Sequence, residues 1–351
     1  HSKQVDALMI LLDIRNLTLE IESNGVLVKA LDKVSLSICE KEIRALVGES
    51  GSGKSLIVRA ISGSLPPQWI ITADRLTWRG QNLLKMSTFE RQKIMRRDIA
   101  VIFQDPQAAL DPSVKLGEQF RESIPDEFIN SRWWWQQRAE QNRIASAQLT
   151  RVGIKDVKKC LNSYVHELPD DVCQKFMIAM ALVSQPTLLI ADDPTRGMET
   201  STKRQIMSLC KNLNRHSDLS ILFVSHDLLA ISSIAHTITV LYSGQTVEDG
   251  PFDSVRRKPF HPYSKALLDS APSFRPELQP KSPLTALKGT IPTLQHLPIG
   301  CRLGPRCPRA QKECVNTPIP RTIHKRQYRC HFPLHIDADE NVDGKYEGID
   351  V

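Results

Sequence analysis

Hydrophobic and polar residues alternate along residues 11–21, and this period of two predicts a β-strand. Short apolar runs predict further, buried strands. These runs are Ile43–Val47, Ile99–Gln104, Leu188–Asp192, Ile221–Ser225 and Ile238–Tyr242. A helical pattern extends to Ile61 after the first run, and helical stretches also separate the last three. Because strands and helices alternate, we expect an α/β fold with a mostly parallel sheet.

The segment between Pro106 and Gln185 shows no strand pattern, and its composition suits helices. It contains the run Gln137–Val152 and three consecutive tryptophans, Trp133–Trp135. We expect an inserted helical subdomain here. The tryptophans either pack in a core, the commoner role of an aromatic run, or form part of a docking edge for a partner.

Length and charge narrow the class of protein only slightly. A chain of 351 residues predicts two to three domains. Lys and Arg number 46 against 39 Asp and Glu, a net charge of +7 that suits lipid headgroups, nucleotides or nucleic acid. The sequence has neither an apolar run of eighteen residues nor a leader pattern, so we expect a cytosolic chain without a membrane-spanning helix.

The segment Gly48–Ser55 matches the phosphate-binding pattern G-x-x-x-x-G-K-[ST] and lies between a predicted strand and a predicted helix. Its glycines let backbone N–H groups wrap a phosphate, Lys54 supplies positive charge, and the Ser55 hydroxyl ligates Mg²⁺. We therefore predict a site for ATP and Mg²⁺. The residues assigned to it are Gly48, Ser50, Gly51, Ser52, Gly53, Lys54 and Ser55.

The strand Leu188–Asp192 ends in two carboxylates, Asp192 and Asp193. In a P-loop enzyme this position holds Mg²⁺ and activates water, although such a pair can also cap a helix. With the P-loop upstream, we assign Asp192 to Mg²⁺.

Residues 11–270 together resemble the ATP-binding cassette (ABC) ATPases. Gln104 is similar to the Q-loop glutamine of the family and His226 to its switch histidine. The resemblance implies that Asp193, His226 and Gln104 act in catalysis and that Ser55, Gln104 and Asp192 surround Mg²⁺. The segments Gln104–Pro112 and His261–Tyr263 resemble the oligopeptide and dipeptide transporter branch.

The sequence departs from the family at the signature segment. There the family has Leu-Ser-Gly-Gly-Gln, which contacts the γ-phosphate bound to the opposite subunit, and this chain has Leu168-Pro169-Asp170-Asp171-Val172. Proline offers neither a hydroxyl nor an N–H, and two carboxylates disfavour a phosphate. We expect this face to be a poor catalytic partner, which is compatible with these residues capping the next helix.

Three further positions differ from the family. Asp193 replaces the usual glutamate base, and because its side chain is one methylene shorter we expect slow hydrolysis. Glu199 replaces the usual D-loop aspartate, and Gly25–Ala30 lacks an aromatic residue to stack on adenine. These departures fit an unequal heterodimer in which only one composite site turns over quickly.

Four cysteines cluster near the C-terminus: Cys301, Cys307, Cys314 and Cys330. In a reducing compartment this favours a metal over disulfides. Basic residues around them would offset the negative charge of a four-thiolate cluster. We predict a [4Fe–4S] cluster, as the resemblance also implies, with zinc and free thiols as alternatives; binding of nucleic acid or anionic lipid by the basic patch is a minor interpretation.

The expected organisation has five parts. Residues 1–8 are a remnant ahead of Met9, residues 9–105 and 186–270 form the nucleotide-binding core, residues 106–185 form the helical signature subdomain, residues 271–336 form a Pro-rich linker and the four-Cys module, and residues 337–351 form an acidic tail.

The resemblance implies an ATPase subunit that couples MgATP hydrolysis to transport of peptides, cationic or antimicrobial ones included, at the cytoplasmic face of the bacterial inner membrane. Its partners would be a second, different ATPase subunit, two transmembrane permease subunits and, indirectly, a periplasmic binding protein, with no nucleic acid. The alternatives are a regulatory ATP-binding subunit, transport of a polyamine or another small cation, and a separate cassette ATPase that acts on nucleic acid.

Overall fold

The computed structural model describes residues 9–23, 25–104, 106–131, 133–270, 287 and 289–336. The predicted remnant, the Pro-rich linker around Pro272–Pro283 and the acidic tail lie outside these residues. The chain divides into two compact units, one within residues 1–86 and 224–351 and the other within residues 87–223.

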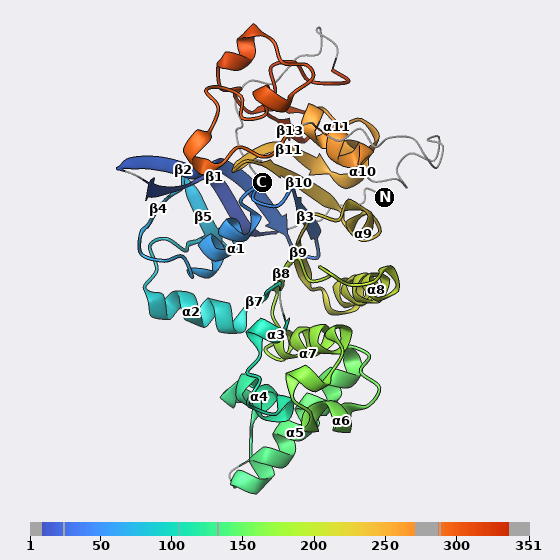
Figure 1. Ribbon diagram of the computed structural model, residues 1–351. Helices are drawn as coiled ribbons and strands as arrows, with labels where there is room; N and C mark the ends of the chain where they lie inside the picture. Colours follow the sequence, from blue (N-terminus) through green and yellow to red (C-terminus); the bar gives the residue numbers. More distant parts are fainter. Residues whose placement is uncertain are drawn as a thin grey trace, which may run out of the picture. The chain divides into compact units, whose positions relative to one another are not determined.

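The first unit contains an antiparallel sheet and part of a larger, mixed one (Figure 1). Its strands are β1 (Ile10–Ser23), β2 (Val26–Cys39), β3 (Ile43–Val47), β4 (Trp69–Thr72), β5 (Arg75–Trp78), β6 (Gln81–Asn82), β10 (Thr237–Tyr242), β11 (Gln245–Pro251), β12 (Arg321–Ile323) and β13 (Arg326–Tyr328). Its helices are α1 (Lys54–Ser62), α9 (Leu228–Ser232), α10 (Phe252–Arg257) and α11 (Pro262–Asp269), with short 3-10 turns η4 (Leu294–His296), η5 (Gly304–Arg306) and η6 (Lys312–Val315).

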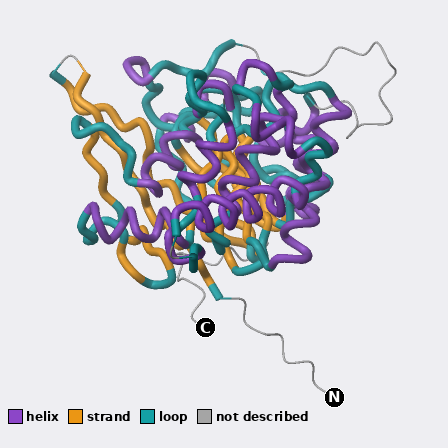
Figure 2. The backbone as a smooth tube through the Cα atoms, turned by 90° about the horizontal axis from the view of Figure 1, so that it is seen from below, coloured by secondary structure: helices purple, strands orange, loops and turns teal. Residues whose placement is uncertain are grey.

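The antiparallel sheet is built on the long strand β1, which the alternating pattern predicted. Strand β1 pairs with β2 along nearly its whole length, and Figure 2 shows the two strands as a projecting hairpin. On its other side β1 pairs with β4 and β5. The inward side chains of β1, such as Leu12 and Leu19, are fully buried.

The strands of the larger sheet in this unit lie in the order β12-β13-β11-β10-β3. Strands β3 and β10 are parallel, as expected. The remaining pairs, β10 with β11, β11 with β13 and β13 with β12, are antiparallel, and the sequence analysis did not predict this arm. Strands β12 and β13 of the predicted four-Cys module thus extend this sheet.

A buried ion pair fixes this arm. The Glu248 carboxylate is fully buried and accepts a 2.6 Å hydrogen bond from Arg326 of β13. It also accepts hydrogen bonds from the backbone N–H groups of Phe260 and His261, at 2.8 and 2.9 Å. The Arg326 guanidinium stacks 3.5 Å from the centroid of the Phe260 ring. Because a buried charge is stable only when it is paired and hydrogen-bonded, this network ties the end of the chain to β11.

The second unit is mainly helical. Its helices are α2 (Thr88–Arg97), α3 (Pro106–Ala109), α4 (Leu116–Ser123), α5 (Trp134–Arg151), α6 (Val157–Asn162), α7 (Asp170–Leu182) and α8 (Thr200–Ser217), with short turns η1 (Asp126–Phe128) and η2 (Val165–Glu167). Its strands lie in the order β9 (Ser220–Ser225), β8 (Leu188–Asp192) and β7 (Ile99–Ile102), and the division between the units falls within β9. Between residues 106 and 185, the described part contains only helices and turns, as expected.

Helices α4, α5, α6 and α7 pack against one another (Figure 1). Phe120 of α4 and Phe176 of α7 meet edge to face at 5.6 Å inside this bundle. The three tryptophans at the start of α5 are not part of it, since Trp133, Trp134 and Trp135 are 56%, 70% and 50% exposed. Core packing is therefore the wrong interpretation of this run.

Candidate nucleotide site

The P-loop connects the fully buried strand β3 to helix α1. Gly48 lies so close to the Leu241 carbonyl oxygen of β10 that any side chain would collide with it. Gly53 has a left-handed backbone with φ of +103° and caps α1. Ser50, Gly51 and Ser55 are exposed, so the N–H groups at the start of α1 border solvent, as a phosphate site requires.

Lys54 folds back over this loop. Its ammonium group donates hydrogen bonds to the carbonyl oxygens of Gly48 and Glu49, at 2.7 and 2.9 Å, and lies 3.4 Å from the Ser52 hydroxyl. The positive charge therefore lies against the backbone of the loop that would bind a β- or γ-phosphate.

Glu49 is a P-loop residue whose role the sequence analysis missed. Its backbone N–H donates to the Tyr263 hydroxyl at 2.8 Å. Its carboxylate accepts two hydrogen bonds from Arg306, from Nη1 at 3.1 Å and from Nη2 at 3.4 Å. Burial, followed by the Glu49 charge, raises the pKa of Tyr263, so this hydroxyl stays protonated. The motif treats Glu49 as a variable position, so its spacing gave no signal for these contacts.

A second arginine of the cysteine-rich segment reaches a turn beside the P-loop. Arg302 donates to the Ser243 carbonyl oxygen and lies 3.6 Å from the Asp32 carboxylate. The next residue, Gly244, donates its N–H to the Ser52 carbonyl oxygen of the P-loop at 2.8 Å. The sequence predicted that the basic residues around the cysteines offset the charge of a metal cluster. Arg302 and Arg306 instead contact Ser243, Asp32 and Glu49.

The second unit carries the predicted carboxylates and Gln104. Asp192 ends β8, and Asp193 follows with a left-handed backbone, φ +49°. Both side chains are largely buried. Gln104 lies two residues beyond β7 and faces the Arg196 guanidinium. With its amide oxygen turned toward Arg196, Gln104 accepts hydrogen bonds from that guanidinium. Sequence reasoning missed Arg196 as a partner for the Q-loop glutamine.

His226 belongs to the first unit and is exposed directly after β9. The following Asp227 caps α9 by accepting a 3.1 Å hydrogen bond from the Ala230 N–H. The P-loop and His226 are thus placed in one unit, and Gln104, Asp192 and Asp193 in the other. Their assignment to nucleotide, Mg²⁺ and catalysis stays a prediction.

The divergent signature segment begins helix α7. Pro169 is the N-cap, and Asp170 and Asp171 occupy the first turn. The helix dipole favours carboxylates in the first turn. Their negative charge occupies the end of the helix that would otherwise attract an anion. Asp171 also pairs with Lys175 at 3.6 Å. Pro169, Asp170 and Asp171 thus form the start of the helix, without a side-chain capping hydrogen bond at Pro169, and a poor phosphate-binding surface there stays a prediction.

The four clustered cysteines line one small cavity of about 10 Å³, together with His261, Arg309 and Phe332. The Cys301 N–H donates to the Cys314 carbonyl oxygen at 2.9 Å. Burial raises the pKa of Cys301, Cys307 and Cys330, the last to about 12, and the neighbouring cysteines raise these values further. Because a metal ligand must be a thiolate, these raised pKa values mean that a metal could bind here only by displacing the protons of the cysteines.

The cavity itself is smaller than a [4Fe–4S] cluster requires. In the described part of the chain, no three His, Cys, Asp or Glu side chains are arranged as ligands of one ion. A space of about 10 Å³ holds at most one water. The donor set therefore fits a metal by its chemistry, but the thiols would have to rearrange to ligate one.

Two family models match the sequence. The model of the ABC transporter matches residues 31–196, and the model of the C-terminal region of oligopeptide/dipeptide transporters matches residues 247–314.

Curated relatives match along almost the whole chain. The peptide transport system ATP-binding protein SapD of Salmonella typhimurium is 49% identical, over 94% of this chain and 100% of its own length. SapD of Haemophilus influenzae is 43% identical over 93% of this chain and 94% of its own length. The dipeptide transport ATP-binding protein DppD of Escherichia coli is 35% identical over 93% of this chain and 98% of its own length.

The fold also matches solved structures. The dimeric structure of MJ0796, a bacterial ABC transporter cassette, covers 69% of this chain and 98% of its own, with a TM-score of 0.59 at 24% identity. The structure of cbiO1 from Clostridium perfringens covers 71% of this chain and 93% of its own, with a TM-score of 0.57 at 22% identity. The P-loop geometry, the cassette fold and relatives matched along their full length lead to one conclusion: this chain belongs to the ABC transporter family and is an ATPase of that family.

Proposed function

We propose that the chain is the ATP-binding subunit of a peptide transporter and that it hydrolyses MgATP to drive transport. The similarity to SapD over the full length of that protein carries this proposal. Gly48–Ser55 would hold the phosphates, with Ser55, Gln104 and Asp192 around Mg²⁺ and Asp193 and His226 acting on the attacking water. The relatives do not favour transport of polyamines or action on nucleic acid.

The chain would work as one half of a heterodimer with a second, different ATPase subunit. The support is the start of α7, where Asp170 and Asp171 oppose the binding of a phosphate from a partner. The Lys54 site would then be completed by an intact signature segment of the partner and turn over faster. If hydrolysis at Asp193 proves negligible, the same arrangement describes a regulatory subunit.

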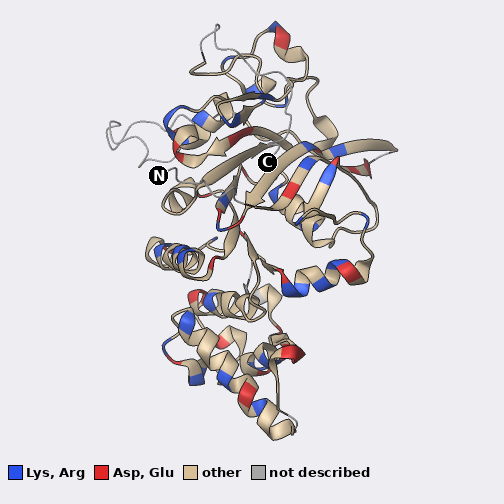
Figure 3. Cartoon of the chain, turned by 180° about the vertical axis from the view of Figure 1, so that it is seen from behind, with Lys and Arg blue, Asp and Glu red and all other residues tan. Residues whose placement is uncertain are grey.

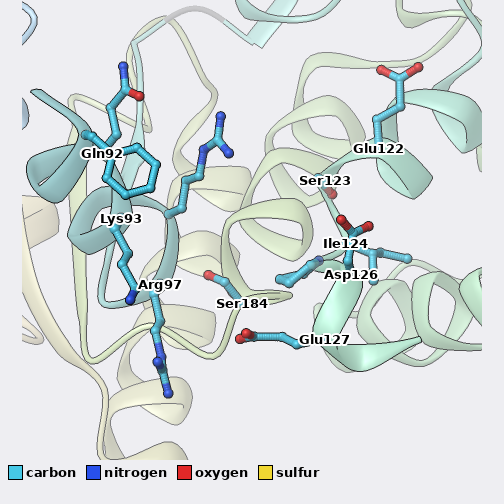
Figure 4. A pocket seen from close by; sticks show the side chains of 12 residues that line it. Gln92, Lys93, Arg97, Glu122, Ser123, Ile124, Asp126, Glu127 and Ser184 are labelled. Atoms are coloured by element: carbon cyan, nitrogen blue, oxygen red, sulfur yellow. The ribbon is translucent and has the colours of Figure 1, made fainter. Parts of the chain in front are cut away.

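Two transmembrane permease subunits would bind the second unit at the cytoplasmic face of the bacterial inner membrane, and a periplasmic binding protein would contribute indirectly. Among the described residues, no helix combines the length and apolar character that crossing a bilayer requires. A cavity of about 710 Å³ offers a place for a permease segment. Lys93 and Arg97 of α2 line one side and Asp126 and Glu127 the other, as Figure 4 shows.

Figure 3 colours the ribbon of α2 blue at its Lys and Arg positions. A segment that carries both charge signs would fit such walls better than a purely apolar one. The exposed Trp133–Trp135 cluster would add an aromatic contact for the same partner.

The cysteines would bind a [4Fe–4S] cluster or, alternatively, one zinc ion, held by Cys301, Cys307, Cys314 and Cys330. Their shared cavity supports a metal, and its small size makes zinc the less disruptive occupant. Protein purified without oxygen would be brown with about four iron and four sulfide per chain for a cluster, or colourless with one zinc. Metal-free protein of unchanged stability would contradict both.

The proposed function is tested by purifying the chain with its membrane partners from detergent extracts. We expect two permease subunits and a second ATPase to co-purify, and MgATP hydrolysis by the reconstituted complex to rise when peptides are presented. Recovery of nucleic acid in place of membrane subunits would contradict the proposal.

A further inference from the structure

Glu49 is held at three points around the P-loop backbone. The Tyr263 hydroxyl accepts from its N–H, the Lys54 ammonium donates to its carbonyl oxygen, and Arg306 binds its carboxylate with a two-pronged guanidinium contact. The backbone N–H groups that would wrap a phosphate follow this residue directly in the chain. A shift of Glu49 would therefore shift the phosphate-binding loop.

Arg306 is itself well fixed. Its side chain is only 9% exposed, and its Nη1 lies 3.3 Å from the Tyr242 hydroxyl. The guanidinium carbon lies 5.8 Å from the centroid of the Tyr242 ring, and that ring packs against Tyr263 at 4.7 Å. Arginine in such a geometry binds a carboxylate in one orientation only, and lysine lacks the planar fork that imposes it.

The chain position of Arg306 connects the P-loop to the cysteines. Arg306 ends η5 and directly precedes Cys307, and Arg302, which holds the turn next to Ser52, directly follows Cys301. Two of the four cysteines thus have a neighbour that contacts the P-loop or the turn bound to it. A movement of the cysteine-rich segment would be transmitted to the loop along these two arginines.

We propose that Arg306 is a positioning residue of the nucleotide site and that through it the cysteine-rich segment 301–330 sets the affinity for MgATP. The proposal rests on the P-loop being the nucleotide site, as proposed above. Arg306 does not touch the nucleotide; it fixes the loop backbone, so it affects binding of the phosphates more than the chemical step.

The primary test compares Arg306→Ala with the control Lys312→Ala, an exposed basic residue of the same segment that does not line the cysteine cavity. Binding of MgATP is measured by titration with a fluorescent ATP analogue on the full chain. We expect the dissociation constant to rise about three- to tenfold for Arg306→Ala and to stay within twofold for Lys312→Ala. Equal constants for the two variants would overturn the proposal.

A double-mutant cycle identifies the contact responsible. Glu49→Ala should weaken binding as much as Arg306→Ala does, and the double variant should lose no more than either single one, because one contact is removed in all three. Losses that multiply in the double variant would show that the two residues act separately and would contradict the proposal. Arg306→Lys should recover only part of the affinity.

Further measurements distinguish a positioning role of Arg306 from two other causes of weak binding. These causes are unfolding of the variant and a wrong assignment of the nucleotide site. In steady-state hydrolysis, Arg306→Ala should raise KM while kcat changes less than twofold; a fall in kcat at unchanged KM would contradict the proposal. If Arg306→Ala unfolds, Glu49→Ala carries the test, since its side chain is partly exposed. Lys54→Ala reports on the site itself: if that variant binds MgATP normally, the P-loop assignment fails whatever Arg306 does.

Discussion

The Lys54 ammonium group lies 2.7 Å from the carbonyl oxygen of Gly48, six residues earlier in the chain. This contact closes the P-loop into a compact ring in which the charge faces inward. A bound phosphate would exchange a neutral carbonyl partner for an anionic one, so the ammonium group would gain an ion pair in addition to its hydrogen bond.

Replacing Lys54 by Ala should therefore weaken MgATP binding strongly, because the phosphate loses its cation. Ser55→Ala should weaken binding in the presence of Mg²⁺ and have less effect without it, since only a metal ligand is removed. Equilibrium titration with and without Mg²⁺ measures both. Unchanged affinity in both variants would remove the P-loop assignment.

Asp193→Asn should lower hydrolysis at the Lys54 site about tenfold or more, given the usual contribution of a general base. Asparagine tolerates the left-handed backbone of this position, so the fold should be kept. Single-turnover hydrolysis in the assembled complex, with nucleotide affinity as the control, measures the effect. A variant as fast as wild type would favour the regulatory role.

Changing Pro169-Asp170-Asp171 to Ser-Gly-Gly should raise turnover at the P-loop of the partner ATPase, because two carboxylates leave the start of α7 and N–H groups become available. Hydrolysis is measured in the heterodimer with the Lys54 site inactivated. Asp171→Asn alone is the matched control, and we expect a smaller gain from it. No gain from the triple change would mean that the loss of activity has its cause elsewhere.

Arg326→Met should destabilise the first unit by about 3–5 kcal/mol, the usual cost of leaving a buried carboxylate without its partner. Glu248→Gln should cost less than Glu248→Leu, because the amide oxygen still accepts from one of the backbone N–H groups of Phe260 and His261. Urea unfolding of each variant measures these differences. Stability within about 0.5 kcal/mol of wild type, the range of an ordinary surface change, would contradict the buried-network interpretation.

Trp134→Ser should change the free energy of unfolding by less than about 1 kcal/mol, because the side chain is 70% exposed. If the tryptophan cluster binds the permease, the same variant should reduce the amount of permease that co-purifies. Phe120→Ala, inside the neighbouring helical bundle, is a contrasting control that should cost about 3–5 kcal/mol. A large loss of stability in Trp134→Ser would revive core packing.

The strands of the nucleotide-binding core could be predicted because their signal is local. Ile43–Val47 and Leu188–Asp192 are short apolar runs next to motif residues, and the structure gives both the same bounds. The β11–β13 pairing had no such signal, because β13 has only three residues and its stability comes from distant contacts with Glu248 and Phe260.

The candidate site shows the same limit. The motif gave the residues that face a phosphate, but not those that support the loop from behind. Arg306 lies in a basic run whose charge suggested compensation of a metal cluster, and only the fold shows that its guanidinium binds Glu49 instead. Likewise, Gln104 and Arg196 lie in two loops far apart in the chain, and no sequence pattern predicts that their side chains meet.

The Glu248–Arg326 pair also sets an order of events during synthesis. Arg326 follows Glu248 by 78 residues, which a ribosome adds in roughly 4–16 seconds at about 5–20 residues per second. During that interval strand β11 would be the open edge of the sheet, with the Glu248 carboxylate on it still without Arg326. Charged residues on an exposed edge discourage pairing with another nascent chain. The carboxylate that later becomes the buried partner of Arg326 would thus first discourage pairing between unfinished chains.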